Sequence, residues 1–105
     1  MLAKINFELK LANHEFVNVE LWDNDLFLDD KLKSLTIKKS GKYEMLFDTN
    51  SSGELRPELY ILIFSMSGEL IFRSKIYDNI SSLAQDEITG FNETKTIDIG
   101  LIELI

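Results

Sequence analysis

The sequence predicts an all-β protein: a seven-stranded antiparallel β-sandwich of Greek-key, immunoglobulin-like type, formed as one domain by residues 1–105. Two observations carry this prediction. Apolar and polar residues alternate with period two in short runs spaced roughly 10 residues apart, as in half-buried strands. Turn-forming residues separate the runs, and helical periodicity is nearly absent. With 105 residues, 45% of them hydrophobic, the chain is large enough to bury a core of its own.

The first two strands show the alternation most clearly. Residues 3–11 alternate strictly, and a second run from Phe16 to Trp22 follows the turn-tolerant residues 12–15. Trp22 alternates to the face opposite Val17, Val19 and Leu21, so it is expected either on the outer surface of the sheet or beneath the loop that follows. The residues predicted to face the core are Ala3, Ile5, Phe7, Leu9, Leu11, Val17, Val19 and Leu21.

The next strands are predicted as two hairpins. Runs at Leu32–Lys39 and Tyr43–Asp48 flank Ser40-Gly41-Lys42, so these two strands are expected to pair. Runs at Leu59–Phe64 and Leu70–Tyr77 flank Ser67-Gly68-Glu69 and are expected to form the second hairpin.

The C-terminal third is less regular. The pattern lapses between Asp78 and Asn92, where Ser81–Glu87 is predicted to form one helical turn. The last strand is predicted over Thr94–Ile102, with Ile97, Ile99 and Leu101 facing inward.

Charge excludes some partners. The net charge of −7 and pI near 4.6 disfavour nucleic acid and anionic membranes, which attract clustered Lys and Arg. No apolar run approaches the roughly 18 residues of a membrane-spanning helix, and residues 1–7 do not look like a signal peptide. The chain has no cysteine and hence no disulfide. These features leave the cellular compartment open.

The candidate site is an acidic loop after the second strand. Asp23, Asp25, Asp29 and Asp30 follow one another closely, and calcium takes six to eight oxygen ligands, so these carboxylates are candidate metal ligands. The alternative is a solvated loop whose aspartates cap backbone N–H groups.

An apolar tripeptide interrupts the acidic loop. Leu26, Phe27 and Leu28 stand at its predicted tip, where exposure would favour contact with a protein partner. The alternative is that Phe27 or Leu28 folds back and plugs the end of the sandwich.

One strand is apolar on both faces. Tyr60, Leu62 and Phe64 alternate with core-facing residues, so the outer face of this sheet is expected to be covered. Homodimerisation through the sheet and coverage by the segment 78–92 both account for this pattern, and both stay open.

Catalysis is not expected. His14 is the only histidine, so neither a Ser-His-Asp arrangement nor a multi-histidine metal site can be assembled. The sequence therefore favours a non-catalytic module.

The order of these signals resembles the transthyretin-like and carboxypeptidase-regulatory-like β-sandwich superfamily. Its V-x-L-x-D-x-D segment with a D-D-x-L continuation is matched by residues 19–25 and 29–32, and its G-x-Y turn by Gly41-Lys42-Tyr43. Its P-x-L strand entry is matched by Pro57-Glu58-Leu59, and its Gly hairpin by Ser67-Gly68-Glu69. The resemblance implies an accessory module that contacts a protein partner through end loops or an exposed sheet.

The acidic loop also resembles the third calcium loop of C2 domains, which reads W/F-D-x-D followed by a further Asp. Trp22-Asp23-Asn24-Asp25 and Asp30 match it. This resemblance implies the alternative function, a calcium-dependent binding module. In a C2 domain the third calcium loop lies towards the C-terminal part of the domain, whereas the acidic loop of this chain follows only two strands. Topology therefore argues against a C2 fold.

Overall fold

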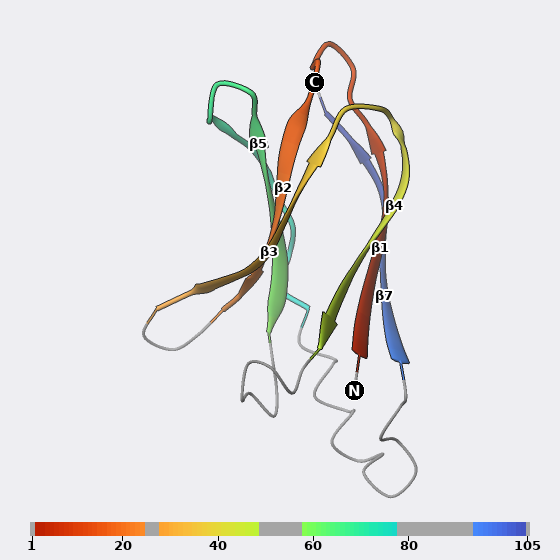
Figure 1. Cartoon of the computed structure of the whole chain (residues 1–105), viewed down its shortest axis with the longest axis vertical. Coiled ribbons are helices and arrows are strands. Elements are labelled where there is room, and N and C mark those ends of the chain that lie inside the picture. The colour runs from red at the N-terminus through yellow and green to blue at the C-terminus, as the bar shows by residue number, and fades with distance from the viewer. Residues whose placement is uncertain (1, 25–27, 49–57, 78–93, 105) are drawn as a thin grey trace, which may run out of the picture.

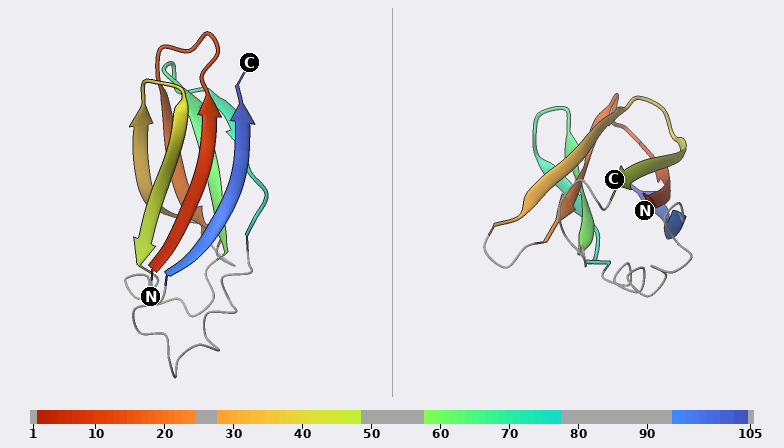
Figure 2. Two further views of the ribbon diagram at one scale, coloured as in Figure 1. Left: turned by 90° about the vertical axis from the view of Figure 1, so that its right-hand side faces the viewer. Right: turned by 60° about the horizontal axis from the view of Figure 1, so that its bottom comes forward.

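A computed structural model describes residues 2–24, 28–48, 58–77 and 94–104, which form seven strands and no helix. The strands form two sheets, ordered β4-β1-β7 and β3-β2-β5-β6, and the sheets pack face to face (Figures 1 and 2). This architecture confirms the predicted all-β sandwich. The strands are β1 (Leu2–Lys10), β2 (Val17–Asp23), β3 (Asp30–Ile37), β4 (Gly41–Asp48), β5 (Leu59–Ser65), β6 (Leu70–Arg73) and β7 (Thr94–Glu103).

The core fills the space between the sheets. Period-two alternation places every second side chain inward, and each fully buried aliphatic residue stabilises the fold by roughly 1.5–3 kcal/mol. Trp22 lies half-buried on the outer face, one of the two positions expected from its alternation. The residues at 1% exposure or less include Ala3, Ile5, Leu9, Val17, Val19, Leu21, Ile37, Leu59, Ile61 and Ile63.

The predicted hairpin of the third and fourth strands is wrong. β3 pairs with β2 in one sheet, whereas β4 pairs antiparallel with β1 in the other, so residues 38–40 cross between the sheets (Figure 1). The Ser40 hydroxyl accepts a hydrogen bond from the Leu11 amide at 2.9 Å, which fixes the crossing against the end of β1. A turn signal predicts that the chain changes direction, but it does not specify the strand with which the next segment pairs.

The second predicted hairpin is confirmed. β5 and β6 pair antiparallel around a turn in which the Gly68 amide donates to the Ser65 carbonyl at 2.9 Å. β6 ends at Arg73, earlier than predicted, because the buried Ser74 hydroxyl accepts a hydrogen bond from the Ile61 amide at 2.8 Å.

The sequence predicted a wholly antiparallel sandwich, and this prediction is wrong. β1 and β7 run parallel, and their register shifts between Asn6 and Phe7 because β7 carries an extra residue beside Gly100. The shift reverses the inward alternation, so Leu101 is 50% exposed and Ile102 is buried. The prediction that Leu101 faces inward is therefore wrong.

Two further predictions concern helices. The helical turn predicted at residues 81–87 lies outside the described residues. In the part of the chain that is described, no helix is long and apolar enough to span a bilayer.

Candidate functional site

The first aspartate of the acidic loop is buried where β2 ends. Asp23 is 3% exposed, and its Oδ1 accepts a hydrogen bond from the Glu58 amide at 3.1 Å. Next to it, the Asn24 amide donates to the Glu58 carbonyl at 2.7 Å, and Asn24 Nδ2 donates to Glu58 Oε2 at 2.9 Å. These contacts tie the end of β2 to the residue that precedes β5.

The other aspartates lie in different surroundings. Asp29 Oδ2 accepts a hydrogen bond from the Tyr60 hydroxyl at 2.5 Å, whereas Asp30 is exposed and faces Asp23 in the β2–β3 register. Asp25 lies outside the described residues. Among the residues that the structure describes, no three His, Cys, Asp or Glu side chains come together to hold a metal.

The predicted apolar tip is described only in part. Leu28 is 74% exposed, whereas Leu26 and Phe27 lie outside the described residues. Leu28 therefore neither plugs the end of the sandwich nor contributes to its core.

The outer face of the four-stranded sheet carries a group of partly or fully exposed side chains, three of them apolar. Leu62 pairs with Arg73, and Phe64 with Leu70, across the β5–β6 hairpin. Leu62 and Phe64 are partly buried, and Leu70 is 48% exposed. These four residues are named the β5–β6 patch. Met66, in the adjoining turn, is 50% exposed.

Tyr60 lies beside the patch on the same strand. The Arg73 guanidinium lies over its ring, 5.2 Å from the centroid, within the range of a cation–π interaction. Burial, followed by the hydrogen bond to Asp29, raises the pKa of Tyr60 to about 12, although the Arg73 charge acts in the opposite direction. Asp29, Tyr60 and Arg73 therefore form a chain of contacts from the acidic loop to the patch.

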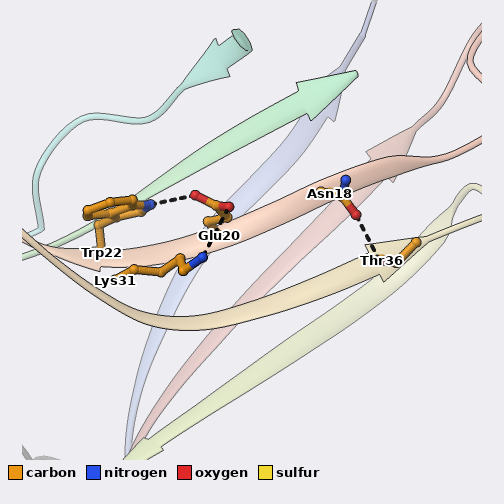
Figure 3. A network of polar contacts seen from close by, with 5 residues as sticks. All are labelled: Asn18, Glu20, Trp22, Lys31 and Thr36. Carbon is orange, nitrogen blue, oxygen red and sulfur yellow. Dashed lines mark hydrogen bonds and ion pairs between the residues drawn. The ribbon is translucent and has the colours of Figure 1, made fainter. Parts of the chain in front are cut away.

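The β2–β3 half of this face is polar. Glu20 accepts a hydrogen bond from Trp22 Nε1 at 2.9 Å and lies 3.8 Å from Lys31 Nζ (Figure 3). Further along, the Thr36 hydroxyl donates to Asn18 Oδ1 at 2.8 Å. These contacts satisfy polar groups within the module and separate the polar half from the apolar patch.

The outer face of the other sheet differs in character. It bears an open hollow of about 560 Å³ whose lining includes Asn6, Glu8, Lys42, Glu44 and Asp98. Glu44 is 3.6 Å from Lys4 Nζ, and the Gly100 amide donates to Asp98 Oδ1 at 3.1 Å. The lining therefore combines charges of both signs with the apolar side chains of Phe7, Tyr43 and Leu101.

Sequence reasoning found part of the site. It identified Asp29, Trp22 and the two-sided apolar strand, but it missed Arg73, Leu70 and the link between Asp29 and Tyr60. A polar residue such as Arg73 in an alternating strand usually faces solvent. The alternation alone does not show which residues of the neighbouring strand lie beside it.

Comparisons with known proteins concern the fold. No protein-family model matches the sequence, and no curated protein sequence matches it. A crystal structure of a 9R-lipoxygenase from Cyanothece PCC8801 is similar with a TM-score of 0.53 and 20% sequence identity. The match covers 97% of this chain and 16% of the lipoxygenase chain, so this chain corresponds to a small part of the much larger lipoxygenase. At this identity the similarity concerns the β-sandwich fold alone.

Proposed function

We propose that this protein is a non-catalytic binding or accessory module that contacts a protein partner through the β5–β6 patch. The observation that carries the proposal is the exposed Leu70 in a partly buried apolar group that surrounds an exposed arginine. Phe64 and Leu70 form a cross-strand pair on an outer sheet face, and Arg73 lies against Tyr60 next to them. Contiguous exposed apolar surface of this kind marks interaction sites on soluble proteins.

Residue types support the same proposal. Interface centres are enriched in aromatic residues, Met and Arg and depleted in Lys, Glu and Asp. Phe64, Met66 and Arg73 fit this composition, whereas four of the nine residues that line the hollow on the opposite sheet are charged, three of them acidic. The outer face of the β3-β2-β5-β6 sheet is therefore a better candidate for the interaction site than the outer face of the β4-β1-β7 sheet.

A matched pair of substitutions tests the proposal. Leu70 and Leu101 are 48% and 50% exposed but lie on opposite sheets, so either can become lysine at little cost to the core. The immobilised wild-type chain would be used to capture its partner from extracts of the cells that express it. We expect Leu70→Lys to weaken capture by about tenfold or more and Leu101→Lys to leave it unchanged. Equal capture by both variants would contradict the proposal.

We also propose that the sandwich is transthyretin-like, with the accessory role that this resemblance implies. Support comes from the positions of the motifs. Gly41-Lys42-Tyr43 opens β4, the turn between β5 and β6 contains Ser67-Gly68-Glu69, and Glu58-Leu59 leads into β5. An experimental structure of a transthyretin-like accessory domain bound to its partner would test whether the equivalent sheet is used.

Calcium binding by Asp23, Asp25, Asp29 and Asp30 stays a prediction. Asp23 and Asp29 already accept hydrogen bonds from protein donors, which weakens the case for them as ligands. Calorimetric titration with Ca²⁺, together with the melting temperature at millimolar calcium, tests the alternative. If calcium produces no heat and no shift in melting temperature, calcium binding is excluded.

A further inference from the structure

Arg73 is an exposed guanidinium held against an aromatic ring among apolar side chains. Its cross-strand partner is Leu62, and the neighbouring pair is Phe64 and Leu70. We propose that Arg73 binds a carboxylate of the partner, so that the partner contributes an apolar segment carrying an Asp or Glu. This inference rests on the proposed function and specifies the chemistry of the partner.

The Tyr60 ring orients the guanidinium. Tyr60 is 4% exposed, and its hydroxyl is hydrogen-bonded to Asp29, so the ring is fixed in place. Donation to a carboxylate makes the phenol more electron-rich and strengthens its attraction for the cation lying over it. The planar N–H edge of a guanidinium matches the geometry of the two oxygens of a carboxylate.

No carboxylate of the described residues neutralises Arg73. Its interaction within this part of the chain is the one with Tyr60. Glu20 pairs with Leu62 in the same cross-strand row, but its two oxygens are engaged by Trp22 and Lys31 (Figure 3). The chain has 18 acidic and 11 basic residues, yet at this position a positive charge stands without an acidic partner from the described residues.

The surroundings determine what kind of acid fits. Leu62 is the cross-strand partner of Arg73, and the next outward pair is Phe64 and Leu70, so a partner that binds Arg73 also removes apolar surface from water. Exclusion of water also strengthens the ion pair. A segment with apolar residues beside its acid therefore binds better than a purely acidic one, which the chain's net charge of −7 repels.

Small probes test this chemistry without the natural partner. Hexanoate supplies a carboxylate and an apolar tail, hexanamide supplies the tail without charge, and hexylamine reverses the charge. Each is titrated into the ¹⁵N-labelled protein, and the Arg73 Nε–H and Leu70 amide signals are followed by NMR. We expect hexanoate to produce saturable shifts with a Kd of roughly 1–10 mM. Hexanamide should bind at least about fivefold more weakly, and hexylamine should produce no shift.

Two variants locate the effect. Arg73→Lys keeps the charge but loses the planar fork, and it should weaken hexanoate binding by about fivefold or more. Lys75 is the matched control because its ammonium also lies over a tyrosine ring, that of Tyr77, at 5.1 Å. Lys75→Gln should leave hexanoate binding unchanged. The amide spectrum of each variant shows whether it is folded.

Equal binding of hexanoate and hexanamide would overturn this inference and leave the proposed function standing on apolar contact alone. Unchanged hexanoate binding by Arg73→Lys, or no binding of hexanoate at all, would also overturn it. Sedimentation of the wild type adds one more outcome: a dimer that Leu70→Lys abolishes would assign the patch to a second copy of the chain. Capture of the partner by Leu70→Lys and Leu101→Lys tests the proposed function separately.

Discussion

At the residue scale, aspartates of the acidic loop serve as acceptors for donors elsewhere in the chain. Asp23 accepts from the backbone at Glu58, and Asp29 accepts from Tyr60. A buried acceptor that loses its donor, or a donor that loses its acceptor, costs about 1–3 kcal/mol. These carboxylates therefore contribute to stability whether or not a metal binds.

Removing each carboxylate in metal-free buffer separates the two roles. With EDTA present, Asp23→Ala should lower the free energy of unfolding by about 1–3 kcal/mol, because it leaves the Glu58 amide unpaired. Asp30→Ala, at an exposed position, should change it by less than about 0.5 kcal/mol. Urea unfolding followed by Trp22 fluorescence measures both. A negligible effect of Asp23→Ala without metal would show that its structural role is wrong.

Tyr60 predicts how stability depends on alkaline pH. Its pKa is raised from 10.0 to about 12 in the folded state, so its contribution is complete below pH 10 and is lost as pH rises toward 12. At pH 11 the wild type should have lost about 1.4 kcal/mol through this residue. Tyr60→Phe should be less stable than the wild type at pH 8 by about 1 kcal/mol. At pH 11 the difference should disappear or change sign, because the roughly 1.4 kcal/mol that the wild type loses is as large as its advantage at pH 8.

Urea unfolding at the two pH values measures this difference. Titration of other groups affects the wild type and Tyr60→Phe alike, so it cancels in the comparison. A stability difference that stays constant from pH 8 to pH 11 would contradict the raised pKa.

At the scale of the strands, sequence alone predicted the elements well and their pairing less well. Period-two alternation is a local property, and it identified all seven strands. Pairing depends on contacts between distant segments, so the crossing at Ser40 was read as a hairpin. The bulge beside Gly100 was missed for a related reason, because one extra residue reverses the alternation that follows it.

The bulge gives a prediction at this scale. Gly100 has φ of +88°, a conformation that residues with a Cβ adopt only with strain. Gly100→Ala should therefore lower the free energy of unfolding by about 1–2 kcal/mol. Glu103→Ala, at an exposed position of the same strand, should change it by less than about 0.5 kcal/mol. Equal effects in urea unfolding would show that the bulge does not require glycine.

At the scale of the whole molecule, the two outer faces differ in kind. The β4-β1-β7 face bears charged side chains of both signs, and the β3-β2-β5-β6 face combines a polar half with an apolar patch around Arg73. The sequence predicted that the outer face of the two-sided strand would be covered. It could not identify the patch, because Leu62 and Arg73 become neighbours only through the β5–β6 register.

If the proposed function is right, a partner covers the β5–β6 patch in the cell. Carbene footprinting of the chain in extracts of the cells that express it, compared with the purified chain, measures coverage directly at each side chain. We expect labelling of Leu70 to fall several-fold in the extract, whereas labelling of Leu101, equally exposed on the opposite sheet, should stay the same. Unchanged labelling of Leu70, or equal protection of Leu70 and Leu101, would contradict the proposed function.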